Sequence, residues 1–99
     1  MENYLQKLFY ALSDKTRLRI VKILLDTGEV CICNLQRVFN TSQPKISFHM
    51  RILRDAGIVR GEKRGKWVYY KLNYLPECIE NIIRNMPSIN LEKNCEVKI

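Results

Sequence analysis

The sequence predicts a mainly α-helical domain that carries a single β-hairpin. Three observations predict this fold class. Apolar residues recur at helical spacing in five segments, and two short strand-like segments, the second of alternating polarity, flank the turn Arg64-Gly65. The chain has 99 residues, which suits one domain, and its hydrophobic fraction of 46% is that of a globular protein. We expect residues 1–87 to form this domain and residues 88–99 to form a polar C-terminal tail.

The first three predicted helices are short and amphipathic. Ser13 and Asp14 can cap a second helix over residues 16–26, and Gly28 should end it. A third helix is expected over residues 34–39. The first helix is set by apolar residues three or four positions apart: Leu5, Leu8, Phe9 and Leu12.

A fourth helix is predicted over residues 43–55, directly after the polar break Asn40-Thr41-Ser42. Pro44 is tolerated in this helix because a first-turn N–H has no partner within the helix. Ala56-Gly57 should end it.

The remaining elements are a hairpin and a final helix. Residues 58–63 and 66–72 read as the two strands, and the final helix follows Pro76 and ends at Pro87. The predicted order is therefore α-α-α-α-β-β-α. The apolar stripe of the final helix consists of Ile79, Ile82, Ile83 and Met86.

Positive charge is concentrated in the middle of the chain. Residues 43–71 hold eight Lys or Arg and two Asp or Glu, a balance of +6 within a total of +7. Residues 1–42 carry +2 and residues 72–99 carry −1. A focused basic region suits a polyanion, because each phosphate that a protein neutralises releases condensed counterions.

Two short helices joined by a tight polar turn form a helix-turn-helix, whose second helix enters the major groove of DNA. In the helix over residues 43–55 the apolar stripe can face the domain, which leaves the polar side chains for base edges and phosphates. The basic hairpin beside it is then a wing. The sequence therefore predicts a winged helix-turn-helix that binds double-stranded DNA. We predict these DNA-binding residues: Ser42, Gln43, Lys45, Ser47, Phe48, His49, Arg51, Arg64 and Lys66.

Several motifs are typical of one known family. They are 11–20 (ALSDKTRLRI), 29–35 (EVCICNL), 42–47 (SQPKIS) and 65–70 (GKWVYY), with His49, Leu53 and Ala56-Gly57. Over roughly residues 5–83 the chain resembles the ArsR/SmtB family of metalloregulatory repressors. The resemblance implies a homodimer built from the first and last helices. It also implies repression of a resistance or homeostasis operon, and release from operator DNA when an inducer binds.

Cys31 and Cys33 lie in a segment that resembles the thiolate box of the arsenite- and antimonite-responsive members. That box has a third cysteine three residues after the second, where this chain has Gln36. The resemblance implies As(III) or Sb(III), or another soft metal ion, as an inducer at Cys31 and Cys33, with no cofactor required. Cys78 or Cys95 could supply a third sulfur, from the same chain or from its partner.

The spacing of the two cysteines constrains how they could bind one ion. Residues i and i+2 of an α-helix point about 200° apart, so Cys31 and Cys33 cannot share an ion within a helical turn. We expect the start of the third helix to unwind or remain extended, which would couple ion binding to DNA affinity. Two alternatives stay open: a thiol-based redox or reactive-sulfur sensor, and a family member with no metal response.

Other classes of protein fit the sequence poorly. No Gly-rich phosphate loop is present, and the single histidine, His49, lies on the predicted DNA face, so we do not expect an enzyme. The last helix offers Glu77 and Glu80 but no histidine, which disfavours a zinc site of the histidine and carboxylate type. No apolar run approaches the ~18 residues of a membrane span, and the N-terminus resembles no signal peptide. We therefore expect a cytoplasmic protein whose cysteines are reduced.

Overall fold

The computed structural model describes residues 1–89. The predicted mainly α fold with a β-hairpin is confirmed, and a third strand, β1, was not predicted. Residues 90–99, with Cys95 and most of the predicted tail, lie outside the described residues. Among the described residues no helix is long and apolar enough to cross a bilayer. The elements in order are α1 (Glu2–Leu12), α2 (Lys15–Thr27), β1 (Glu29–Cys31), α3 (Ile32–Phe39), α4 (Gln43–Asp55), β2 (Val59–Arg64), β3 (Trp67–Leu72) and α5 (Glu77–Arg84).

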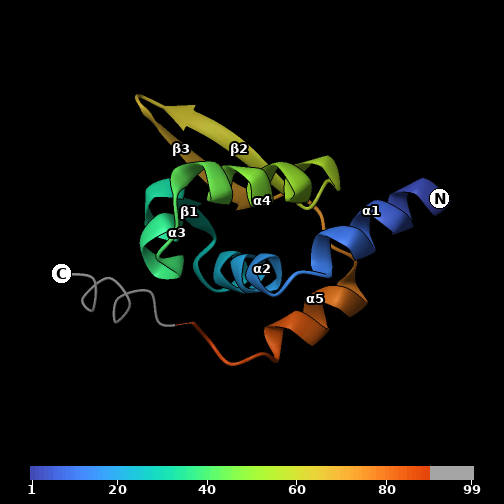
Figure 1. Cartoon of the computed structure of the whole chain (residues 1–99). Coiled ribbons are helices and arrows are strands. Elements are labelled where there is room, and N and C mark those ends of the chain that lie inside the picture. The colour runs from blue at the N-terminus through green and yellow to red at the C-terminus, as the bar shows by residue number, and fades with distance from the viewer. Residues whose placement is uncertain (90–99) are drawn as a thin grey trace.

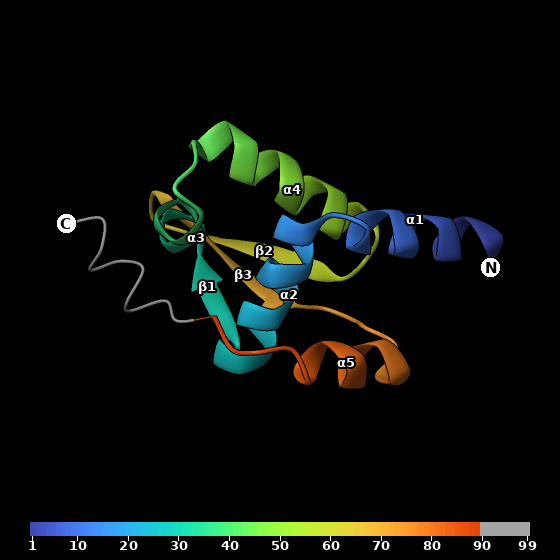
Figure 2. The same ribbon diagram turned by 60° about the horizontal axis from the view of Figure 1, so that its bottom comes forward.

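Helix α2 lies at the centre of the molecule (Figure 1). It contacts α4 and the sheet on one side and α5 on the other. In both views α1 and α5 lie at the same end of the molecule, opposite α3, and the β2–β3 hairpin projects beside α4 (Figures 1 and 2). Helix α4, which we call the reading helix, and the β2–β3 hairpin, the predicted wing, are thus held on one side of α2.

The ends of α2 are defined by local chemistry. Its N-cap is Asp14, whose Oδ2 accepts a hydrogen bond from the Arg17 N–H at 3.1 Å. Its C-cap is Gly28, at a φ of 85° that residues with a Cβ rarely adopt. Both boundary signals were predicted from the sequence.

Two cations of α2 are buried, and each satisfies the C-terminal carbonyls of another helix. Arg17 Nε donates to the Ala11 carbonyl of α1 at 2.8 Å, and Lys22 Nζ donates to the Arg84 carbonyl of α5 at 2.8 Å. The last carbonyls of a helix have no partner within it and carry the negative end of its dipole. Helix α2 therefore holds the ends of both α1 and α5.

Strand β1 makes the hairpin into a three-stranded antiparallel sheet in the order β1-β3-β2. Glu29 pairs with Lys71 and Cys31 pairs with Tyr69. Helix α3 starts at Ile32, two residues before the predicted start. Cys31 is consequently strand and N-cap, not part of the helix.

The core lies between α2, the α3–α4 pair and the sheet. The predicted inward residues of α4, Ile46, Met50 and Leu53, are each 0% exposed, which confirms that stripe. The largest fully buried side chains are Leu8, Ile20, Ile23, Leu24, Leu35, Ile46, Met50, Leu53, Ile58, Val21 and Val59.

Candidate nucleic-acid interface and thiol pair

Helix α4 presents polar and aromatic side chains at the surface. The helix follows Ser42, whose Oγ accepts a hydrogen bond from the Lys45 N–H at 3.4 Å. Ser47 is half-buried. Five predicted DNA-binding residues of this part of the chain are exposed: Ser42, Gln43, Lys45, Phe48 and Arg51.

His49 does not share that outward face. Its Nδ1 lies 3.0 Å from Arg17 Nη1 and 4.0 Å from Asp14 Oδ2, and its side chain is 16% exposed. Burial, the Arg17 guanidinium and Lys45 lower the pKa of His49, while Asp14 opposes them. His49 thus joins the reading helix to α2 and is mostly neutral at neutral pH.

In the wing, the Arg64 guanidinium is already paired with two carboxylates. Its guanidinium bonds Glu29 of β1 and Glu62 of β2, and it lies 4.5 Å from the Tyr69 ring centroid. The pKa of Glu62 is lowered by Arg64. Lys71 Nζ lies 3.7 Å from Glu29 Oε2. A phosphate that approached Arg64 would compete with two carboxylates.

The remaining predicted wing residue, Lys66, is exposed and lies 5.5 Å from the Trp67 ring centroid. Exposed basic residues Arg60 and Lys63 lie in the β2 strand. Even without Arg64, the wing therefore has an exposed cationic surface formed by Lys66, Arg60 and Lys63.

Cys31 and Cys33 are close together at the junction of β1 and α3. Cys31 Sγ accepts a hydrogen bond from the Cys33 N–H at 3.4 Å. Burial, together with the neighbouring Cys31 thiol, raises the pKa of the Cys33 thiol. Cys31 has an extended backbone and precedes α3, so the separation of about 200° between residues i and i+2 of a helix does not apply to this pair.

A third sulfur does not join this pair within the described residues. Residues 1–89 hold no group of three His, Cys, Asp or Glu side chains that could bind a metal ion. Cys78 is exposed on α5. Cys95 lies outside the described residues.

Two residues that support the interface were absent from the sequence-based site. Arg17 holds His49, and Glu29 holds Arg64. A signal for Arg17 did exist: it precedes the buried Ile20, Val21 and Leu24 by helical spacings, so it lies on an apolar stripe. No local signal marked Glu29, because its partner lies 35 residues away.

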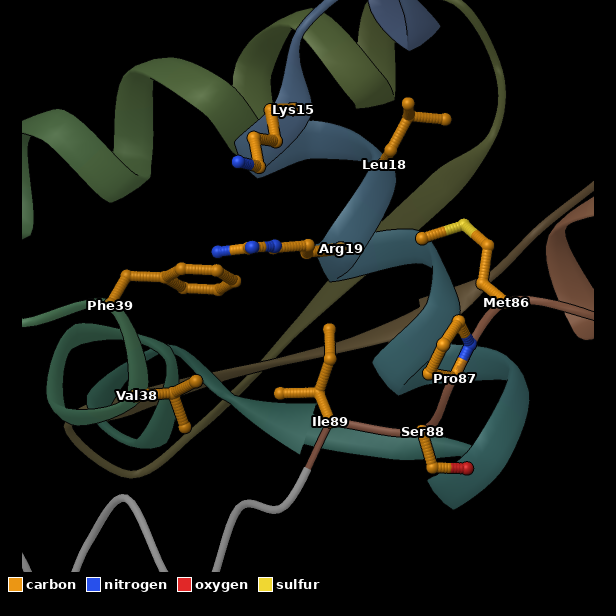
Figure 3. A pocket seen from close by; sticks show the side chains of 9 residues that line it. All are labelled: Lys15, Leu18, Arg19, Val38, Phe39, Met86, Pro87, Ser88 and Ile89. Carbon is orange, nitrogen blue, oxygen red and sulfur yellow. The ribbon is translucent and has the colours of Figure 1, made fainter.

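A cavity of about 530 Å³ separates α2 and α3 from the segment after α5 (Figure 3). Lys15, Leu18 and Arg19 line it from α2, and Arg19 extends toward Phe39 of α3. Residues 86–89 line the other side. The chain after α5 thus crosses α2 toward α3.

A helix-turn-helix with an exposed reading helix, a basic wing and a buried core defines the class of protein: a winged helix-turn-helix DNA-binding regulator. Residues 14–60 match the family described as "Bacterial regulatory protein, arsR family". The chain belongs to this family, whose members are DNA-binding transcriptional regulators and not enzymes. The predicted family resemblance is confirmed.

Named relatives agree with this assignment. The chain is 45% identical over 78 residues to the "Arsenical resistance operon repressor" of Escherichia coli K12, covering 78% of this chain and 67% of that protein. It is 42% identical over 73 residues to the protein of the same name from Bacillus subtilis 168, covering 74% and 69%. Among solved structures, HlyU from Vibrio cholerae matches with a TM-score of 0.73 and 29% identity over 84% of this chain and 91% of that one.

Proposed function

We propose that this chain is a homodimeric repressor of an arsenic-resistance operon. In this proposal α4 and the wing bind operator DNA, and the protein dissociates when As(III) or Sb(III) binds Cys31 and Cys33. The observation that carries it is the position of the thiol pair. Cys31 belongs to the wing sheet, and Cys33 belongs to the first helix of the helix-turn-helix. The names of the relatives support the choice of inducer.

The chemistry needs only the two thiols. Each sulfur replaces one hydroxyl of arsenous acid, and each thiol proton leaves with that hydroxyl as water. The third position on arsenic can keep its hydroxyl, or the Cys78 sulfur of the partner chain can replace it, with the thiol proton and the hydroxyl leaving as a third water. Thiolates are the ligands that soft ions prefer.

Binding at this pair would act on both parts of the DNA interface. Cys31 Sγ now accepts a hydrogen bond from the first turn of α3, and the sulfur would give up that bond on ligation. Helix α3 packs against α4, and β1 pairs with β3 of the wing. A change at the β1–α3 junction would therefore reach the reading helix through α3 and the wing through the sheet.

Homodimerisation through α1 and α5 has its own support. Both helices lie at one end of the molecule (Figures 1 and 2), and each exposes a large apolar side chain. Phe9 is 57% exposed and Ile82 is 67% exposed. A second copy that covered this surface would also supplement the small core of one chain.

The test is fluorescence anisotropy of the reduced protein on DNA from upstream of its own gene, titrated with arsenite and then with cadmium. We expect arsenite to release the DNA from the wild type. We expect Cys31→Ser and Cys33→Ser to bind DNA as the wild type does and to ignore arsenite. Cys78→Ser tests the partner-chain sulfur: an unchanged arsenite response would mean that Cys31 and Cys33 suffice, and a weakened response would mean that Cys78 is a third ligand.

Other outcomes favour other functions. Release by an oxidant or a persulfide, with no response to arsenite, would favour a redox sensor. Loss of DNA binding in the untreated Cys→Ser variants would contradict a role limited to the inducer. Reduced thiols suit a cytoplasmic location.

A further inference from the structure

A second cavity, of about 380 Å³, lies between α2, the α3–α4 turn and the reading helix. We call it the α2–α4 cavity. It lies beside Lys45, at the N-terminal part of α4 that a helix-turn-helix brings to DNA. The side chains that matter for its chemistry are Thr16, Arg19, Asn40, Thr41, Lys45 and His49.

Two cations on the wall of this cavity carry no carboxylate partner within residues 1–89. Neither Arg19 nor Lys45 has a carboxylate oxygen within 4.0 Å there. The Asp14 carboxylate lies 4.0 Å from His49 Nδ1 and caps α2 by accepting from the Arg17 N–H. Within residues 1–89 the positive charges of Arg19 and Lys45 are therefore not paired with a carboxylate.

The third donor is His49, and Arg17 sets its tautomer. A guanidinium can only donate, so the 3.0 Å contact from Arg17 Nη1 requires His49 Nδ1 to be an acceptor. The ring proton is then on Nε2. Arg17 is itself held, because its Nε donates to the Ala11 carbonyl at 2.8 Å and its Nη2 to the Tyr10 carbonyl at 3.3 Å.

We propose that the α2–α4 cavity binds one backbone phosphate of the DNA. Arg19 and Lys45 supply the charge, His49 Nε2–H supplies a hydrogen bond, and Arg17 is the positioning residue that keeps His49 in its donor form. Thr16 and Thr41 add hydroxyl donors. Such a contact would fix the register of α4 in the groove without reading sequence.

The contact would also involve a helix outside the helix-turn-helix. Arg19 and Arg17 belong to α2, and Arg17 bonds the C-terminal carbonyls of α1. Helix α1 belongs to the proposed dimer surface. Arg17 would therefore connect the position of the reading helix to the dimer interface. This inference rests on DNA binding by the family and is independent of the inducer.

The experiment is a methylphosphonate scan. A duplex that the wild type selects from random sequences is synthesised with one neutral methylphosphonate at each backbone position in turn. We expect one position in each half-site to cost the wild type about tenfold in affinity, as the loss of a charge-assisted contact would. In Arg19→Gln the penalty at that position should largely disappear, while the control Lys66→Gln on the wing should keep it.

Two further readouts separate a phosphate contact from a base contact. Arg19→Gln should lower the slope of log K against log salt by about 1. It should also weaken binding to the selected duplex and to random duplex by the same factor. A larger loss on the selected duplex alone would mean that Arg19 reads bases, and would overturn the proposal.

A pair of substitutions at His49 separates its hydrogen bond to the phosphate from its contact with Arg17. His49→Asn keeps an acceptor near the Nδ1 position and removes the donor at the Nε2 position, so it should fold normally and bind all duplexes several-fold more weakly with an unchanged salt slope. His49→Gln can keep a donor but leaves Arg17 Nη1 without its acceptor, so it should lose stability. Equal DNA affinity of His49→Asn and wild type would overturn the role of His49.

A free phosphate ion would be recognised by the same chemistry. Titration of inorganic phosphate, followed by the NMR signals of the His49 ring, distinguishes the two sources. Saturable binding of the ion with the same methylphosphonate penalty in wild type and Arg19→Gln would overturn the DNA contact. A wild type that binds no duplex at all would overturn both this inference and the proposed function.

Discussion

The ammonium group of Lys22 lies 2.8 Å from the carbonyl oxygen of Arg84, a residue 62 positions later in the chain. Its side chain is only 5% exposed, and it also lies 3.2 Å from Asp26 Oδ1. Arg84 is the last residue of α5, so the contact places a cation at the negative end of that helix. One buried lysine thereby fixes α5 against α2.

Replacing Lys22 should therefore destabilise the fold. We expect Lys22→Met to lower the free energy of unfolding by about 1–3 kcal/mol, because the Arg84 carbonyl and the Asp26 carboxylate lose a buried partner. Urea unfolding at fixed protein concentration measures the change. The control is Lys15→Met, an exposed lysine of the same helix, and equal stability of both variants would contradict the role of Lys22.

Stability should depend on pH through His49. Burial, with Arg17 and Lys45, lowers the pKa of His49 below its ordinary value of 6.5, although Asp14 opposes them. The unfolded chain therefore takes up a proton at a higher pH than the folded chain. The stabilisation is present above pH 6.5 and is lost as the pH falls through the folded-state pKa.

Because His49 is the only histidine, no other imidazole contributes to the change in stability near pH 6.5. Urea unfolding between about pH 5 and pH 7.5 should show a decrease on acidification in the wild type that is absent in His49→Asn. Identical pH profiles for the two proteins would contradict the assignment.

Removing the carboxylate of Glu29 should strengthen DNA binding. Glu29 and Glu62 now neutralise Arg64, and Glu29→Gln would leave its guanidinium more available to a phosphate. We expect affinity to rise by up to about fivefold, since an exposed ion pair contributes up to about 1 kcal/mol. Anisotropy at several salt concentrations measures this.

The control for this prediction is Glu77→Gln, which makes the same charge change on α5, away from the wing. If Glu77→Gln raised the affinity as much as Glu29→Gln, total charge and not the Arg64 pairing would be responsible.

The apolar end of the molecule should control oligomeric state. We expect Ile82→Asp to convert the dimer into a monomer at micromolar concentration, because a buried unpaired charge opposes association. Sedimentation velocity gives the answer. Phe48→Ser removes a similarly exposed apolar side chain, 49% exposed, from α4 and should leave the dimer intact while weakening DNA binding.

The sequence by itself determined the helices, the hairpin and the helix-turn-helix. These elements follow from spacing and capping within one segment, as with Asp14 and Gly28 at the ends of α2 and the buried stripe of Ile46, Met50 and Leu53. It also determined the family, because the motifs that identify the family are made of residues adjacent or nearly adjacent in the chain.

Only the tertiary structure decided how the site is assembled. Strand β1 has three residues, too few to show an alternating pattern. It forms because its backbone pairs with that of β3. The inward position of His49 depends on Arg17, 32 residues away, and the ion pairing of Arg64 depends on Glu29, 35 residues away. Periodicity reports which face of an element is apolar, whereas these partners are set by how separate elements pack, so a local pattern cannot contain them.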